Sequence, residues 1–311
     1  MGVFVVTLAA TFTGKLFAQD ILNGISLGAV FALLGLGVVL IYKSSGVLNF
    51  AHGSMAMFST YIYFEISRSF SGIPVPVATA IAVGAGALLG AGAYLLVFRK
   101  MQQAGLLAKV IASLALAGIL QGAAAFLWRN ASQARVPQQF PESSLRIAGV
   151  GLGWQEIGTI ILTIVCGVVL ILILRGTIFG IALRATAQNR TAAKMLGVRE
   201  TRVAATSWAI GGGLAALAGV LVIPLGVLTA YSMTGYMVRG FVAAVVGGFV
   251  SLPAAILGGF VLGATQEGLK ATPADQLASV FAGLAVAFLL LTRVERFFAL
   301  DQELRALQEL G

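Results

Sequence analysis

Long apolar runs dominate the chain, and short polar breaks separate them. Nine runs can be delimited along the sequence, at residues 21–42, 47–67, 75–98, 106–128, 156–174, 203–223, 236–250, 253–270 and 276–292. Most of them approach the roughly 20 residues that a helix needs to cross the hydrocarbon core of a bilayer. They are continuous rather than alternating, which favours helices over the strands of a membrane barrel. The pattern predicts an all-α fold, a polytopic bundle of about eight or nine transmembrane helices, because the run 236–250 is short for a full crossing.

The composition supports a membrane protein. The chain is 59% hydrophobic and only 10% charged, with a mean hydropathy of +0.98, whereas soluble domains carry roughly 25% charged residues. It also contains 39 glycines, and glycine lets helix backbones approach closely in membrane bundles. Pairs of glycines four residues apart occur at Gly24/Gly28, Gly86/Gly90 and Gly259/Gly263. We expect these pairs at close helix crossings.

Lysine and arginine set the expected orientation, because cytoplasmic loops are enriched in them. The break between the fifth and sixth runs holds one acid, Glu200. Its bases are Arg175, Arg184, Arg190, Lys194, Arg199 and Arg202. A second basic break, two spans earlier, contains Arg99, Lys100 and Lys109. Placing both breaks in the cytoplasm gives an N-terminus outside and a C-terminus inside, and it explains the net charge of +9 without nucleic acid.

No polar stretch is long enough to form a separate soluble domain. Residues 1–311 are therefore predicted to form a single transmembrane domain with a cytoplasmic loop at about 175–202 and a cytoplasmic tail at 293–311. The tail carries one apolar stripe, formed by Phe297, Leu300, Leu304 and Leu307. Such a stripe is typical of an amphipathic helix, which would lie either on the membrane surface or against a partner.

The chain lacks the residues that most catalytic chemistry requires. It has one histidine and one cysteine, and it shows no close pair of carboxylates or set of metal ligands. The stretch "GVVLIYKSS" at 37–45 resembles a phosphate-binding loop, but Tyr42 stands where that motif requires glycine. No catalytic residue, metal or bound cofactor is predicted. Glu267 is an acid within an apolar run, which makes it a functional candidate, although solvation at the membrane edge is a simpler explanation.

The basic loop contains a segment with the pattern of a short two-faced helix. Within 188–196, Arg190 and Lys194 share one face beside a small apolar face. Gly197 is well placed to end this helix in a left-handed conformation. A short helix of this kind between membrane spans suits docking into a groove of another protein. A solvated loop that binds anionic lipid headgroups is the alternative.

The only histidine lies in the stretch "GVLNFAHG" at 46–53. Asn49 and His52 are three residues apart and would share a helix face. Glycines in this stretch permit an interrupted helix, and interrupted helices often line transport pathways. Asn49, His52, Gly53 and Ser54 are therefore candidates for the substrate pathway or an inner gate. The alternative is that they pack and hydrogen-bond between helices and so fix the bundle.

Two stretches of the chain look alike and suggest an internal repeat. They are "GVVLIYKSSGVLNF" at 37–50 and "GVLVIPLGVLTAY" at 219–231. On the expected topology they run in opposite directions, as in the inverted repeats of transporters. Chance similarity between apolar segments is the alternative.

Four stretches resemble the permease family of the branched-chain amino acid ABC importers. In order along the chain they are 23–42, 46–53, 184–198 and 247–263, and the resemblance extends over nearly the whole sequence. Within the third, "TAAKMLG" is similar to the cytoplasmic loop of ABC importer permeases, although Thr191 replaces the glutamate of that pattern. The resemblance implies that this loop couples the spans to ATPases through Arg184, Arg190, Ala192, Ala193, Lys194 and Gly197.

The resemblance also implies a division of labour. The chain would pair with a second, homologous permease subunit, two ATPase subunits that bind ATP and Mg, and an extracytoplasmic substrate-binding protein, in the bacterial inner membrane. It would carry branched-chain or other hydrophobic amino acids and would not itself be an enzyme. Ser54 stands where such permeases usually have an acid, so urea or short amides stay open as cargo. An ion-coupled secondary transporter is a further alternative, although such proteins normally place paired acids mid-membrane.

Overall fold

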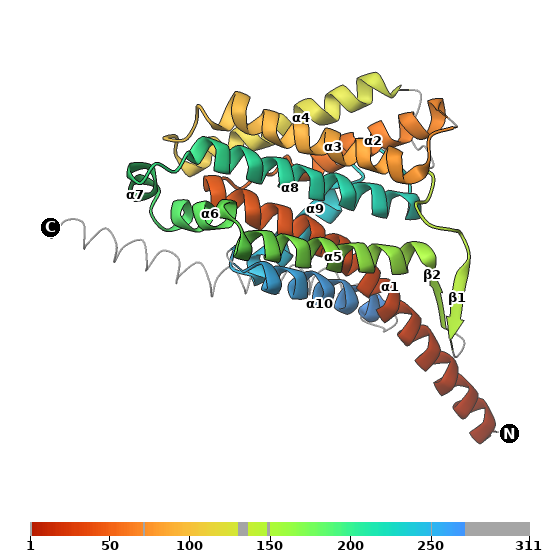
Figure 1. Cartoon of the computed structure of the whole chain (residues 1–311). Coiled ribbons are helices and arrows are strands. Elements are labelled where there is room, and N and C mark those ends of the chain that lie inside the picture. The colour runs from red at the N-terminus through yellow and green to blue at the C-terminus, as the bar shows by residue number, and fades with distance from the viewer. Residues whose placement is uncertain (1, 71, 130–135, 148–149, 250, 271–311) are drawn as a thin grey trace.

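The computed structural model describes residues 2–70, 72–129, 136–147, 150–249 and 251–270, and helices dominate them (Figure 1). The helices are α1 (Gly2–Ser45), α2 (His52–Ser69), α3 (Val75–Ala93, continued by the π-helical turn Tyr94–Phe98), α4 (Leu106–Leu127), α5 (Trp154–Gly176), α6 (Ile178–Gln188), α7 (Arg190–Met195), α8 (Glu200–Val222, continued by the 3-10 turn Ile223–Leu225), α9 (Thr234–Val246) and α10 (Leu252–Lys270). Among the described residues, strands β1 (Ser144–Ile147) and β2 (Val150–Gly153) pair antiparallel.

Five of the described helical segments are long and apolar enough to cross a membrane. They are Phe17–Ser45, Val75–Phe98, Leu106–Leu127, Trp154–Gly176 and Glu200–Leu225. The predicted all-α membrane bundle is therefore confirmed. Helix α9 has only 13 residues, or about 20 Å of helix, so the run 236–250 does not fill a bilayer by itself. The number of spans and the orientation stay predictions, and the run 276–292 and the tail 293–311 lie outside the described residues.

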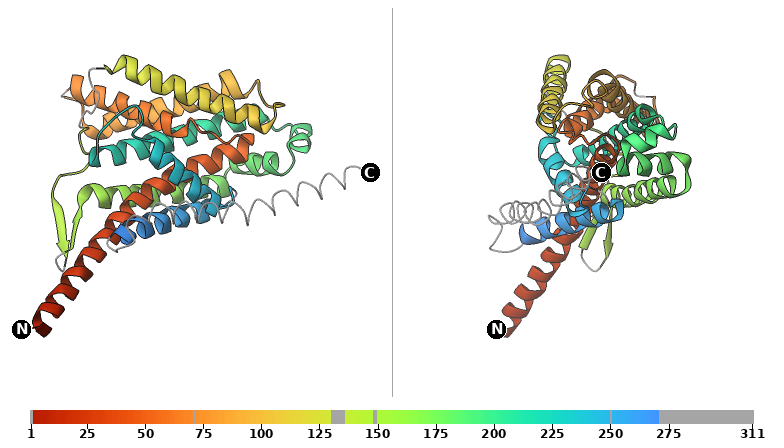
Figure 2. Two further views of the ribbon diagram at one scale, coloured as in Figure 1. Left: turned by 180° about the vertical axis from the view of Figure 1, so that it is seen from behind. Right: turned by 90° about the vertical axis from the view of Figure 1, so that its left-hand side faces the viewer.

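Helices α1 and α8 form the centre of the bundle and run antiparallel. The indole N–H of Trp208, near the start of α8, donates to the hydroxyl of Ser45 at the end of α1 over 3.0 Å. Further along, the two backbones meet at Gly37 and Gly211, where a methyl group on Gly211 would lie 3.2 Å from the Gly37 carbonyl oxygen. The other helices surround this central pair (Figures 1 and 2).

The glycine pairs found in the sequence lie at the crossings that join outer helices to the central pair. A methyl group on Gly24 would lie 2.5 Å from the carbonyl oxygen of Gly263, which joins α1 to α10. On the other side of the bundle, a methyl group on Gly86 would lie 2.6 Å from the carbonyl oxygen of Gly212, which joins α3 to α8. Because these contacts involve backbone atoms, a side chain at any of the four positions would force the helices apart. The expectation of close crossings is confirmed.

The arrangement also supports the inverted repeat predicted from 37–50 and 219–231. Each stretch contains the end of a central helix and the break that follows it, before α2 in one case and α9 in the other. Helix α9 packs on α1 as α2 packs on α8, and α10 covers α1 as α3 covers α8. The contacts of the two sets of three helices therefore correspond, and their first helices, α1 and α8, run antiparallel, as an inverted repeat requires.

Helix α3 offers a matched test of the close crossings. A methyl group on Gly90 would clash with the backbone carbonyl of Trp208, whereas one on Gly92, two residues later, would meet nothing within 4 Å. We expect Gly90→Ala to lower the free energy of unfolding by about 1–3 kcal/mol, because overpacking forces backbone shifts. Gly92→Ala should be neutral or slightly stabilising. Thermal unfolding in detergent, followed by circular dichroism, measures both. Equal melting temperatures for the two variants would contradict the crossing.

Candidate functional site

The break between α1 and α2 is organised by Asn49. The backbone turns at Gly46, which has a φ of 64°. The side-chain oxygen of Asn49 then accepts a hydrogen bond from the Ala51 N–H over 3.0 Å, and its amide lies 3.8 Å from the sulfur of Met55. Asn49 is buried, so its polar groups are used within the chain. This Asn-centred turn directs the chain into α2.

His52 is the first residue of α2, and it is fully buried, with 0% of its surface exposed. Its ring lies against Gly37 of α1, where a methyl group would come within 2.5 Å of the ring Nε2 atom. Neither ring nitrogen makes a hydrogen bond of normal geometry among the described residues. The backbone of Leu34, on α1, lies close to the ring. The glycine at position 37 thus provides the space that the imidazole fills.

The next two residues hold α2 against other helices. Gly53 faces α9, where a methyl group would lie 2.7 Å from the Cβ atom of Met237. The hydroxyl of Ser54 accepts a hydrogen bond from the side-chain amide of Gln121 on α4 over 3.2 Å. The structure therefore brings Asn49 and its three companions together at one junction of helices. Their observed contacts favour packing, and their role in a pathway stays a prediction.

The cytoplasmic loop of the sequence analysis folds into two capped helices between α5 and α8. The hydroxyl of Thr177 accepts from the Gly180 N–H at the start of α6, and the side chain of Asn189 accepts from the Ala192 N–H at the start of α7. Such caps satisfy backbone donors that a helix start leaves unpaired. Gly197 ends the segment with a φ of 83°. The short helix predicted within 188–196, and its termination at Gly197, are confirmed.

Helix α7 is tied to both central helices. The guanidinium of Arg190 donates to the Ser44 carbonyl at the end of α1 over 3.2 Å. Glu200, in the first turn of α8, pairs with Lys194 at 3.0 Å and with Arg190 at 3.9 Å. Ala193, on the inner face of α7, is buried. Helix α7 is therefore attached to the ends of α1 and α8 by a hydrogen bond and two ion pairs.

Two large apolar side chains are exposed at the C-terminal end of α7. Met195 is 79% exposed and Leu196 is 83% exposed. Two large apolar side chains at a polar end of the molecule are unusual for a loop that faces only water, and adjacent exposed apolar groups mark interaction sites. The loop thus directs its ion pairs inward and its apolar residues outward.

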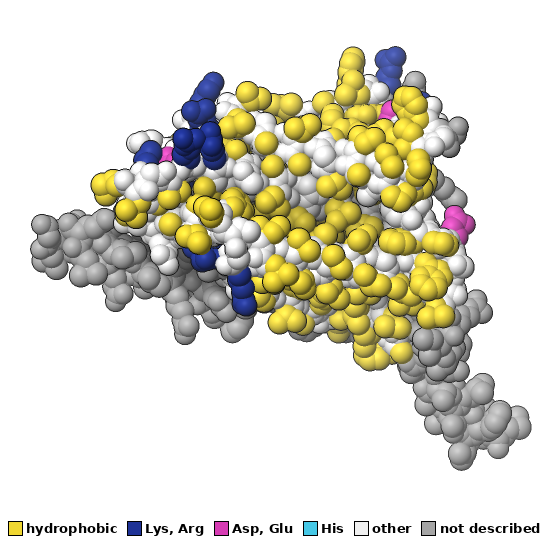
Figure 3. Space-filling model, viewed as in Figure 1, with side chains coloured by type: hydrophobic (Ala, Val, Ile, Leu, Met, Phe, Trp, Pro, Cys, Tyr) yellow, Lys and Arg dark blue, Asp and Glu magenta, His cyan; other side chains and the backbone are white. Residues whose placement is uncertain are grey.

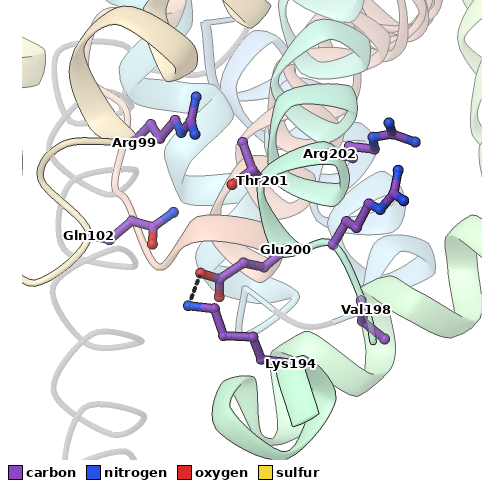
Figure 4. A pocket seen from close by; sticks show the side chains of 8 residues that line it. Arg99, Gln102, Lys194, Val198, Glu200, Thr201 and Arg202 are labelled. Atoms are coloured by element: carbon purple, nitrogen blue, oxygen red, sulfur yellow. Dashed lines mark ion pairs between the residues drawn. The ribbon is translucent and has the colours of Figure 1, made fainter. Parts of the chain in front are cut away.

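A polar cavity of about 530 Å³ lies beside α7. Figure 4 shows Arg99 and Gln102, from the connection between α3 and α4, on one side of it and the Glu200–Lys194 ion pair on the other. The sequence analysis placed Arg99 and the basic loop on the same side of the membrane, and the structure brings them into one cavity. Sequence reasoning missed the part played by Glu200, although its position as the lone acid among the bases was a visible signal.

The remaining loop candidate, Arg184, lies on α6. Its guanidinium donates to the backbone carbonyl of Leu174, at the end of α5. This hydrogen bond folds α6 back against α5 and keeps Arg184 away from α7. The six loop candidates are therefore divided between two helices, with Arg184 on α6 and the others on α7 or at its end.

Comparison with known proteins identifies the family. A family model described as the permease component of branched-chain amino acid transport systems matches residues 20–291. The chain belongs to this family. It is a transport subunit, and its family is not one of enzymes. The resemblance stated from the sequence is confirmed.

Curated relatives cover most of the chain. The high-affinity branched-chain amino acid permease LivH of Salmonella typhimurium is 30% identical over 266 residues, which are 80% of this chain and 85% of the relative. LivH of Escherichia coli K12 gives the same identity and coverage. BraD of Pseudomonas aeruginosa is 28% identical over 291 residues, which are 88% of this chain and 93% of the relative. No solved structure matches the chain. The predicted localisation, a multi-pass protein of the bacterial inner membrane, agrees with these bacterial relatives and with the five membrane-length helices.

Substitution of His52 separates its two interpretations. We expect His52→Ala to leave a cavity between α1, α2 and α8 and to lower the free energy of unfolding by about 2–4 kcal/mol, as for other large buried side chains. Transport by the protein that remains folded should be normal. The measurement is thermal unfolding together with uptake normalised to folded protein in the membrane. Loss of uptake with unchanged stability would instead place His52 in the pathway. Ser59→Ala, which removes a buried hydroxyl without a described partner, is the control and should leave stability unchanged or raised.

Proposed function

We propose that the chain is the membrane-spanning permease subunit of an ATP-driven importer for branched-chain or other hydrophobic amino acids. Two separate ATPase subunits would bind ATP and Mg and energise it. A second, homologous permease subunit would complete the membrane channel, and an extracytoplasmic binding protein would deliver the cargo. The family and the names of the relatives support the cargo class, and the geometry of α7 supports the coupling.

The observation that carries the proposal is the construction of α7. Its exposed Met195 and Leu196 form an apolar contact surface, while its bases are committed to α1 and α8 through Ser44 and Glu200. A partner that binds this surface is thereby connected to both central helices by hydrogen bonds and ion pairs. Closure of two ATPases around ATP could thus be passed directly to the membrane helices.

The cargo and the energy source have alternatives that experiment can separate. The same class of importer could carry urea or short amides, because Ser54 is uncharged where related permeases usually have an acid. A transporter driven by an ion gradient would need no ATPase partners. The described spans offer little support for it, because no group of three or more His, Cys, Asp or Glu side chains gathers among the described residues, whereas ion coupling usually relies on clustered acids within the membrane.

Uptake of radiolabelled leucine in proteoliposomes tests the proposal. The vesicles should contain the chain, its neighbouring permease, the ATPase subunits and the binding protein. We expect uptake to require trapped ATP and to survive an ionophore. Uptake that ignores ATP and collapses with the ionophore would overturn the importer. ATPase activity that responds to a binding protein loaded with urea or an amide, but not with leucine, would retain the importer and correct its cargo.

The apolar face of α7 gives a second test. We expect the double substitution Met195→Asp and Leu196→Asp to abolish the stimulation of ATPase activity by loaded binding protein, because two carboxylates cannot be buried in an apolar contact without a large desolvation cost. Thermal stability of the isolated chain should be unchanged, since both side chains are exposed. The matched control is Leu145→Asp, an exposed leucine of β1 at the opposite end of the bundle (Figure 1). Full stimulation in the double variant would exclude α7 as the ATPase contact.

A further inference from the structure

A second cavity, of about 150 Å³, lies where the ends of four helices meet. It is separate from the cavity beside α7. Its walls come from the end of α1, the end of α5, the first turns of α6 and the start of α10. Among the residues that the structure describes, three bases line it, namely Lys43, Arg175 and Arg184, and no acidic residue does. The cavity is therefore strongly positive.

One of these bases is held in place by the fold, and it lies close to a second. Arg184 donates a hydrogen bond to the carbonyl of Leu174. Leu174 also lines the cavity. Lys43 lies close enough to Arg184 for their positive charges to interact unfavourably. An anion in the cavity would accept charge-assisted hydrogen bonds from these bases. A phosphate group has the charge and the number of acceptor oxygens for this role.

An apolar surface leads to the cavity along α5. Ile164, Val168 and Leu172 are exposed and follow one another at four-residue spacing, so they form a stripe on one face of the helix. The stripe ends at Arg175, at the edge of the cavity. Figure 3 shows the same pattern over α5 and α10, where a broad hydrophobic surface gives way to Lys and Arg side chains toward α6. Ile178, at the start of α6, is 85% exposed beside it. The surface is suited to acyl chains.

We infer that this cavity binds the phosphate headgroup of an anionic phospholipid, whose acyl chains lie along the exposed stripe of α5. Basic pockets between membrane helices on the cytoplasmic side are suited to such headgroups. A soluble anion would bind the bases but would make no contact with the apolar stripe of α5. The larger cavity beside α7 fits this ligand less well, because Glu200 lines it and pairs with Lys194. The inference is independent of the cargo and of the ATPases.

Native mass spectrometry of the full chain tests the inference. The purified protein would be released from micelles that contain equal amounts of phosphatidylglycerol and phosphatidylcholine. We expect the wild-type chain to retain phosphatidylglycerol in preference to phosphatidylcholine. Millimolar inorganic phosphate should not displace it. A wild-type chain with no preference between the two lipids overturns the inference without any variant, and displacement by phosphate alone would show a soluble-anion site instead.

Paired variants locate the site. We expect Lys43→Gln combined with Arg175→Gln to weaken phosphatidylglycerol binding about 25-fold, since each base near an anionic lipid contributes about a five-fold factor. The control is Arg99→Gln combined with Lys100→Gln, which removes the same charge at the connection after α3 and should leave binding unchanged. Size-exclusion profiles and melting temperatures establish that both proteins are folded. Equal loss of lipid in the two double variants would show a general charge effect and would overturn the site.

Discussion

The close antiparallel crossing of α1 and α8 is the constraint on which the rest of the bundle depends. At Gly37 and Gly211 the backbones come close together, and a methyl group at either position would also displace a neighbouring side chain, His52 at the first and Ile41 at the second. In a bilayer there is little hydrophobic driving force between helices, so close packing and internal hydrogen bonds must hold them together. The same device recurs where α10 covers α1 and where α3 covers α8. Glycine at these few positions thus determines which helices can be neighbours.

The polar residues near this crossing follow from the same constraint. His52 fills the space above Gly37, Asn49 satisfies the backbone of the turn before it, and Ser54 bonds to Gln121 on α4. A chain that avoids polar groups places them where a helix is interrupted and backbone groups lose their usual partners. The interruption is thus a compact structural joint, and it lies next to the ion pairs through which α7 connects α1 to α8. The α1–α2 break and the attachment of α7 therefore both lie at the C-terminal end of α1.

Much of this architecture could be predicted from the sequence, and the failures have physical causes. Apolar length marked the helices, glycine spacing marked the crossings, and Gly197 marked the end of α7. The pattern could not show that α1 is a single helix from Gly2 to Ser45, because apolar length alone does not define a helix start. It also could not join Arg190 to Ser44 or Ser54 to Gln121, since those contacts depend on tertiary folding across 146 and 67 residues of sequence. The residue types indicated which side chains form the candidate site. Their hydrogen-bond partners could be identified only from the folded structure.

The position of the Gly37–Gly211 crossing divides α1 into two unequal arms. From the crossing to Ser45, beside the attachment of α7, the helix extends about 12 Å, whereas toward Phe17 it extends about 30 Å. Helix α8 is divided more evenly, with about 16 Å on each side. Any movement applied at α7 would therefore act close to the crossing, whereas the long arm of α1 is held against α10 at Gly24 and Gly28.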